Sequence, residues 1–238
     1  MTSKLRHRNL IAALAGAAVI AVALPGTAAA QSTCDSLGGT VDANQVCQAH
    51  STTATYTMDM SIPVDYPDQQ AVFDYLAQDR ADFLDWLAKF APDGRSQPFM
   101  HDVTAKVYRS GTPDFGTQSL VLTINDDTGF SHEDHPGTSY QAFTYNLGKH
   151  APITFDTLFK PGAKPLDVLN PIVQRELGKH SSTPVQDLDE TAYRNFAITD
   201  DAVIFFFGED QVVVDNSGPH RVSVPRSELA PLLSQELR

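Results

Sequence analysis

Histidines and acidic residues, the types that bind metals and move protons, gather in one short stretch, His132-Glu133-Asp134-His135. A zinc helix of the His-Glu-x-x-His type needs its two histidines four residues apart, so that both point at one ion. Here they are three apart, and Pro136-Gly137 disfavour a sustained helix. On a strand the two side chains would face opposite sides. Only an irregular loop, completed by His101 or a distant carboxylate, would form a metal site.

We therefore interpret residues His132, Glu133, Asp134 and His135 as a polar loop before a strand. The loop is a candidate contact surface for a partner, and no bound metal is expected there.

Ester hydrolysis is the second chemistry that these residues suggest. The groupings Ser139–His135–Asp134 and Ser131–His132–Asp134 contain a nucleophile, a base and an acid. However, neighbours in sequence rarely reach the required geometry, and the Gly-x-Ser-x-Gly turn of many esterases is absent. An esterase is therefore the alternative function, and we assign no catalytic residues.

Other motifs with chemical meaning are weak or missing. The run Phe205-Phe206-Phe207 is more typical of a protein core than of a ligand groove. With 29 acidic residues, a pair of carboxylates that suits glycoside cleavage carries no information. No phosphate-binding loop and no dinucleotide fingerprint occurs, so no cofactor is expected.

Alternating apolar residues and turn signals predict the elements that surround the loop. The expected strands are residues 52–62, 101–108, 118–125, 138–146, 196–199, 203–207 and 221–224. The unbroken apolar run 203–207 predicts a strand covered on both faces. Residues 153–159 are expected to place Phe155, Leu158 and Phe159 against the core.

Three helices are expected. The first, capped by Asp68, runs to about Phe90 and has its apolar stripe at Phe73, Leu76, Phe83, Leu87 and Phe90. Pro165 and Pro171 bracket a short second helix, where Asn170 can act as a cap. Ser227 caps the last helix, at residues 228–237. Together the elements predict a single two-layer α+β domain, with a mostly antiparallel or mixed sheet and packed helices.

The first thirty residues have the pattern of a secretory signal peptide. Three basic residues precede an apolar run of about 15 residues, shorter than the ~20 that span a bilayer, and Ala28-Ala29-Ala30 suit signal peptidase. Cleavage after Ala30 would leave a mature domain of residues 31–238. It would remove three basic and no acidic residues, which changes the formal net charge from −12 to −15. Such a surface excludes nucleic acid, disfavours anionic membranes and attracts cationic proteins.

Two cysteines, Cys34 and Cys47, lie near the predicted mature N-terminus. An even pair in an oxidising compartment predicts one disulfide. It would clasp the N-terminal segment 31–50, where Gly38-Gly39 permit a tight turn.

Six ordered segments carry a resemblance to a known family. They are SIPVDYPDQQ (61–70), DHPGTSYQAF (134–143), PITFDTLF (152–159), NPIVQRELGK (170–179), NFAITDDAVIFFF (195–207) and SVPRSEL (223–229). With the early cysteine pair, they resemble the secreted immunogenic proteins of mycobacteria, whose C-terminal domain is shared with the RsiV anti-sigma factors. The resemblance implies an α+β fold and an exported, antigenic actinobacterial protein.

The same resemblance implies function by binding, because RsiV-like members bind lysozyme. This sequence lacks their transmembrane segment, and Ser131 to Asp134 replace a glycine pair of the family. From the sequence we therefore expect a secreted, monomeric, non-enzymatic protein that engages a cationic partner, lysozyme-like or another host or envelope protein. The alternatives are a cell-envelope esterase and a structural envelope component.

Overall fold

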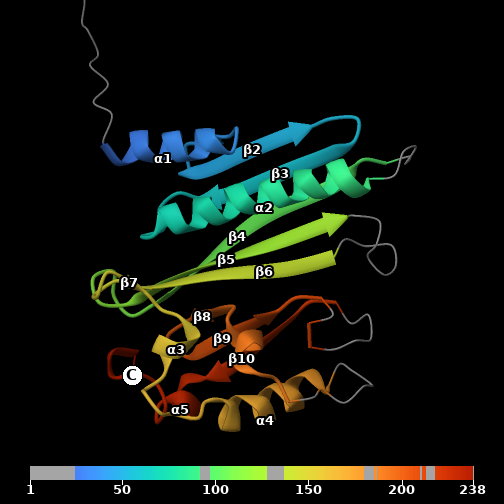
Figure 1. The fold of residues 1–238 in the computed structure, drawn as a ribbon. Coiled ribbons are helices and arrows are strands. Elements are labelled where there is room, and N and C mark those ends of the chain that lie inside the picture. Colours follow the sequence, from blue (N-terminus) through green and yellow to red (C-terminus); the bar gives the residue numbers. More distant parts are fainter. Residues whose placement is uncertain are drawn as a thin grey trace, which may run out of the picture.

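Two β-sheets and seven helical segments make up the part of the chain that the computed structural model describes, residues 25–91, 97–127, 137–179, 185, 187–209, 211–212 and 218–237 (Figure 1). The seven-stranded sheet has the order β1 (Thr40–Val41), β2 (Val46–Thr52), β3 (Tyr56–Pro63), β4 (Phe99–Ser110), β5 (Thr117–Asp127), β6 (Gly137–Asn146), β7 (Ala151–Pro152). The three-stranded sheet has the order β10 (His220–Pro225), β9 (Ala202–Phe207), β8 (Phe196–Ile198). The helical segments are α1 (Pro25–Ser36), α2 (Gln69–Phe90), α3 (Phe155–Leu158), α4 (Leu166–Leu177), η1 (Glu190–Tyr193), α5 (Arg226–Leu229) and η2 (Gln235–Leu237). The predicted α+β class is confirmed.

The seven-stranded sheet is antiparallel except at one pair. Strands β3 and β4 run parallel, and α2 is the helix that connects them across one face of the sheet. Four of the five residues predicted for the apolar stripe of α2 are buried there, whereas Phe90 is 61% exposed because the helix ends beyond the sheet. Asp68 occupies the N-cap position, but its side chain makes no capping hydrogen bond, which corrects that prediction.

The three-stranded sheet and α4 enclose a second core. Alternation along β9 directs Phe205 and Phe207 into this core, together with Tyr193, Leu169 and their neighbours. Phe206 points the other way and packs between Tyr108 and Tyr140 of the large sheet. The prediction that this strand is covered on both faces is therefore confirmed.

Polar side chains join the two sheets at buried positions. Thr144 donates to the carbonyl of Phe196 at 2.8 Å, and Ile198 donates its N–H to Ser119 Oγ at 3.1 Å. The amide of Asn195 bonds the edge of β6, with Oδ1 accepting from Ala142 N at 3.0 Å and Nδ2 donating to Tyr140 O at 2.8 Å. Because buried donors and acceptors must be paired, these contacts fix how the small sheet sits on the large one.

The predicted strands 101–108, 118–125, 138–146, 196–199, 203–207 and 221–224 are confirmed within a few residues. Three further predictions were wrong. The predicted strand 52–62 begins too early, because Thr52 is the last residue of β2, residues 53–55 form a turn, and β3 begins at Tyr56; β2 itself was not predicted. Pro171 lies inside α4, and Asn170 caps nothing but bonds Leu188 and Tyr193. Ser227 lies within the short helix α5 rather than before a long helix.

The disulfide between Cys34 and Cys47 is present, joining α1 to β2. Both cysteines are fully buried, and the turn after α1 uses Gly38 with a φ of +76°. Among the described residues, no helix is both long enough and apolar enough to cross a membrane.

Candidate functional site

The loop singled out in the sequence, His132 to His135, lies outside the described residues, together with Ser131. Ser139 is described, as an exposed residue of β6. The geometry of the two predicted Ser–His–Asp groupings is therefore not described, and the loop stays a predicted contact surface.

A different histidine is joined to a carboxylate and a hydroxyl, on the β2–β3 hairpin. His50 and Asp59 are directly opposite in the antiparallel register, and Thr52 follows two residues later on the same face of β2. His50 Nδ1 lies 2.6 Å from Asp59 Oδ1, and His50 Nε2 lies 2.9 Å from Thr52 Oγ1. Hydrolases with an activated hydroxyl have the same chain of contacts, in which a hydroxyl nucleophile meets an imidazole base and the imidazole meets an orienting carboxylate. We call Thr52, His50 and Asp59 the hairpin relay.

The hairpin relay is open to solvent. The side chains of His50 and Asp59 are 65% and 56% exposed. Beside them is a hollow of about 90 Å³, lined by Gln48, Ala49, His50, Asp59, Met60, Ser61 and Asp102. A cavity of roughly 10–15 Å³ by this measure holds one water, so the hollow suits a small group.

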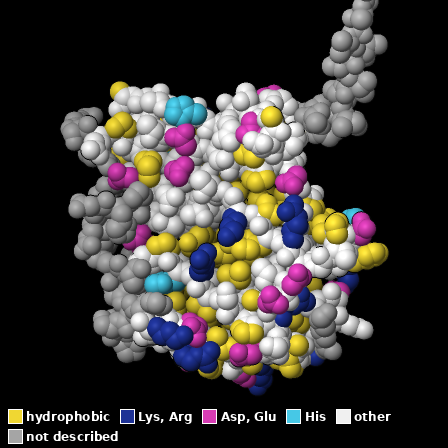
Figure 2. Space-filling view, turned by 180° about the vertical axis from the view of Figure 1, so that it is seen from behind, with side chains coloured by type: hydrophobic (Ala, Val, Ile, Leu, Met, Phe, Trp, Pro, Cys, Tyr) yellow, Lys and Arg dark blue, Asp and Glu magenta, His cyan; other side chains and the backbone are white. Residues whose placement is uncertain are grey.

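Figure 2 shows the charges around this region from behind. Acidic side chains lie on the part that carries β2 and β3, uppermost in both views, whereas Lys and Arg side chains gather from the middle of the molecule downward. A substrate that approaches the hairpin relay therefore meets negative charge.

A second histidine, His101 of β4, is buried beneath α2. Its Nδ1 lies 2.6 Å from Asp126 Oδ1, and its Nε2 lies 3.2 Å from Asp79 Oδ2 without the alignment of a hydrogen bond. Burial lowers the pKa of His101, but the hydrogen bond to Asp126 and the contact with Asp79 outweigh it and raise the pKa to about 9. His101 is thus an imidazolium held between two carboxylates and stacked on Phe83. Within the described ranges, no three His, Cys, Asp or Glu residues are placed to hold a metal.

A hollow of about 430 Å³ lies where the two sheets meet. It is lined by Tyr66, Asp68, Ala142, Phe143, Thr144, Pro152, Ile153, Thr154, Phe155, Asp156, Glu190 and Arg194. We call it the junction pocket. The connection from β3 to α2, strand β6, the segment from β7 to α3, and η1 each contribute a wall.

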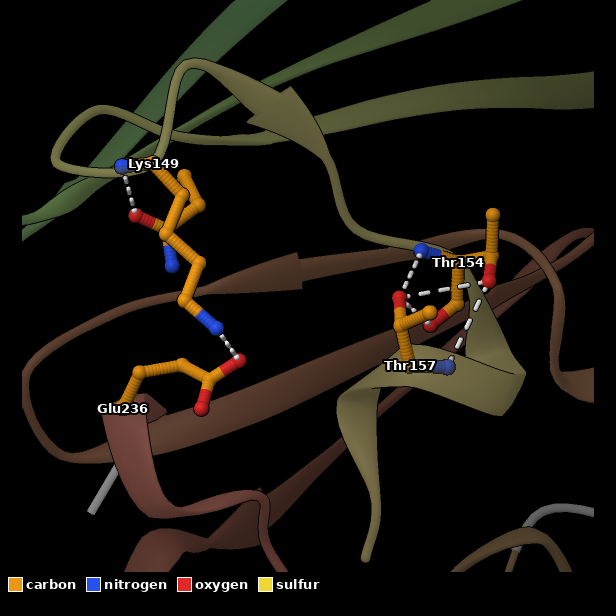
Figure 3. Close-up of polar contacts among 5 residues, drawn as sticks. Lys149, Thr154, Thr157 and Glu236 are labelled. Carbon is orange, nitrogen blue, oxygen red and sulfur yellow. Dashed lines mark hydrogen bonds and ion pairs between the residues drawn. The ribbon is translucent and has the colours of Figure 1, made fainter. Parts of the chain in front are cut away.

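Local hydrogen bonds hold the walls of the junction pocket in place (Figure 3). Thr154 and Thr157 form a reciprocal capping box that fixes the start of α3, with Thr154 N donating to Thr157 Oγ1 at 2.9 Å. Lys149 Nζ, in the turn between β6 and β7, lies 2.6 Å from Glu236 Oε1 of η2. The β6–β7 turn and the C-terminal segment are therefore tied together by this ion pair.

Four charged side chains line the junction pocket: Asp68, Asp156, Glu190 and Arg194. The Asp68 side chain makes no capping hydrogen bond at the start of α2, and Arg194 interacts electrostatically with Asp189 outside the pocket lining. Burial, with a contribution from Asp68, raises the pKa of Tyr66, so its hydroxyl stays protonated. The pocket thus combines aromatic walls with three carboxylates and one guanidinium, a lining of net negative charge.

Comparison with known proteins finds similar proteins in mycobacteria. A protein named Esterase Rv3036c, from Mycobacterium tuberculosis, is 45% identical over 230 residues, which is 94% of this chain and 99% of that one. The immunogenic proteins MPB64 of Mycobacterium bovis and MPT64 of Mycobacterium tuberculosis are each 38% identical over 213 residues, covering 87% of this chain and 91% of theirs. The chain belongs to the mycobacterial immunogenic protein family.

Residues 156–227 also match a family described as a protein of unknown function (DUF3298). Two solved structures of that family share the fold at 13% identity. One, from Bacteroides fragilis, has a TM-score of 0.51 and covers 80% of this chain and 93% of its own. The other, from Pseudomonas aeruginosa, has a TM-score of 0.53 and covers 82% and 97%. The kinship with RsiV that the sequence suggests stays a prediction.

The residues of the hairpin relay were missed in the sequence. His50 and Asp59 are nine residues apart and meet only because β2 pairs with β3. The predicted strand 52–62 contained Asp59, but residues 46–51 were not predicted as a strand, so no pairing of His50 with Asp59 could be expected.

Proposed function

We propose that this member of the immunogenic protein family is an exported hydrolase of short-chain carboxylic esters. In this proposal Thr52 is the nucleophile, His50 the general base and Asp59 the residue that orients the imidazole. The two contacts that join them, at 2.6 and 2.9 Å, carry the proposal. A 45% identical relative that bears the name esterase supports it. Because of the relay, we now favour an enzyme over the non-enzymatic binding protein that we expected from the sequence.

The proposed reaction follows from the tautomer that Asp59 selects. With Nδ1–H donated to Asp59, Nε2 of His50 accepts the proton of the Thr52 hydroxyl as its oxygen attacks the ester carbonyl. The tetrahedral intermediate collapses, and His50 returns the proton to the departing alcohol. Water, deprotonated by His50, then attacks the acyl-threonine and releases the acid. The hollow of about 90 Å³ beside His50 favours a short acyl chain.

Kinetics with p-nitrophenyl acetate test the proposal. We expect Thr52→Val and His50→Gln each to lower kcat/KM at least about 100-fold, as is usual when a general base or nucleophile is removed. Thr52→Ser keeps a hydroxyl and is expected to retain activity. Thr104→Val is the matched control, because Thr104 is an exposed threonine of β4 outside the relay. Wild-type rates in folded Thr52→Val and His50→Gln proteins would refute the assignment, as would an inactive wild-type protein.

An exported binding protein is the second candidate. The net charge of −12 and the acidic end of the molecule support a cationic protein partner, such as a lysozyme-like protein. The export signal, the antigenic character of the relatives named immunogenic proteins and the disulfide between Cys34 and Cys47 agree with function outside the cell. Calorimetric titration with lysozyme at low and high salt tests this candidate. No heat of binding at low salt would exclude lysozyme as the partner.

A further inference from the structure

The junction pocket lies apart from the hairpin relay. The relay lies on β2 and near the start of β3, whereas the pocket is built on β6, β7, α3, η1 and the connection that follows the other end of β3. A ligand in the pocket therefore does not touch the relay, and an inference about the pocket is independent of the proposed hydrolysis.

The apolar part of the pocket fits one large side chain. Phe143, Phe155, Ile153 and Pro152 supply aromatic and aliphatic surface, and the volume of about 430 Å³ falls in the range of small-molecule and peptide sites. Buried Phe155 belongs to the second core, where it packs against Phe159 and Tyr193. This wall is therefore preformed rather than assembled by the ligand.

The charged side chains of the pocket favour a ligand with positive charge. Three carboxylates, Asp68, Asp156 and Glu190, face the space with one cation, Arg194. A fatty acid or another anionic amphiphile would meet a net negative lining, whereas a basic side chain would find acceptors. Arg194 donates only, and a peptide backbone carbonyl is a suitable acceptor for it.

We infer that the junction pocket binds a short peptide segment of a partner protein in which an apolar aromatic side chain stands next to a basic one. The aromatic side chain enters the space between Phe143 and Phe155, and the basic side chain pairs with Glu190 and Asp156. The charge complementarity between the basic side chain and the carboxylates of the lining carries this assignment.

Titration of the full chain with short peptides tests the inference. The probe is the N-acetylated, C-amidated tetrapeptide Gly-Phe-Arg-Gly, measured by isothermal calorimetry and by NMR at low salt. Replacing its phenylalanine by glycine should weaken binding roughly tenfold or more, because burying a phenylalanine contributes about 1.5–3 kcal/mol. Replacing its arginine by glutamate should abolish detectable binding.

Variants of the protein locate the site. Glu190→Gln and Asp156→Asn, both at exposed positions, should each weaken binding of the arginine peptide about 2- to 5-fold, the range of exposed ion pairs. Glu228→Gln removes an exposed carboxylate of α5 that does not line the pocket, and should leave the affinity unchanged.

Three results would overturn the inference. They are equal affinity for the arginine and glutamate peptides, no binding of the arginine peptide at millimolar concentration, and unchanged affinity in Glu190→Gln and Asp156→Asn together. These binding measurements do not depend on ester hydrolysis, so either proposal can fail alone.

Discussion

His50 and His101 each place Nδ1 2.6 Å from a carboxylate oxygen, yet their surroundings differ, and so does their ability to exchange protons with a substrate. His50 is exposed and contacts a hydroxyl with its second nitrogen, so it can exchange protons with a substrate. His101 is 1% exposed, and a second carboxylate takes the place of the hydroxyl. The buried histidine is therefore a structural cation, and its pKa of about 9 keeps it charged at neutral pH.

The protonation of His101 predicts a pH dependence of stability. Its pKa is raised from 6.5 to about 9, so its charge stabilises the fold fully below about pH 6.5, and this contribution is lost as pH rises through 9. The shift corresponds to roughly 3 kcal/mol. Urea unfolding should show that the free-energy difference between wild type and His101→Gln shrinks between pH 6 and pH 9.5.

Tyr75 lies near the same carboxylates, but its pKa is raised to about 12, so it does not titrate in this window. A difference between wild type and His101→Gln that stayed constant from pH 6 to pH 9.5 would contradict the buried imidazolium.

At the scale of single residues, the sequence predicted the partners that are close along the chain. Cys34 and Cys47 were paired correctly because only two cysteines exist. The contact between His50 and Asp59 depends on strand register, and that between His101 and Asp126 on pairing across 25 residues. No local pattern marks such contacts, so the candidate site needed the structure.

Among the elements, α5 connects the two sheets through one side chain. Arg226 donates to Ser110 Oγ at 2.8 Å and Thr199 O at 3.2 Å, and also to the carbonyl of Leu237. It therefore joins the end of β4, the β8–β9 turn and η2.

Replacing Arg226 by methionine should destabilise the protein by about 2 kcal/mol, because hydrogen bonds from a charged donor are lost and three acceptors become unpaired. Thermal and urea unfolding measure the change. Arg221→Met, an exposed arginine of β10, is the control and should remain within about 0.5 kcal/mol of wild type. Equal stability of the two variants would show that α5 does not hold the sheets together.

Elements with strong apolar periodicity were predictable, and elements that depend on tertiary packing were not. Helix α2 and strands β4, β5, β6 and β9 follow their patterns closely. Strand β2 was missed because its buried positions are Cys47 and Ala49, which are small and carry little strand signal. Helix α4 continues through Pro171 because Leu169, Ile172, Val173 and Leu177 bury one face of it.

For the whole molecule, the disulfide closes the N-terminal end of the fold. It links α1 to β2 and spans 13 residues. Reduction, or the pair of changes Cys34→Ser and Cys47→Ser, should lower the free energy of unfolding by about 3 kcal/mol, the loop-closure value for this length. Urea unfolding with and without reductant measures it. The reductant should affect wild type and leave the double variant unchanged; an effect on neither would mean that the clasp does not stabilise the fold.

Both outer strands of the seven-stranded sheet, β1 and β7, are only two residues long. A sheet edge is a template on which another chain can add a strand, and the length of the exposed ladder limits how well such an addition is held. The long central strands of this sheet are paired on both sides along most of their length, by their neighbours or by the Asn195 amide at β6. Each outer strand of this sheet thus offers a template of only two residues, which limits edge-to-edge aggregation through the seven-stranded sheet.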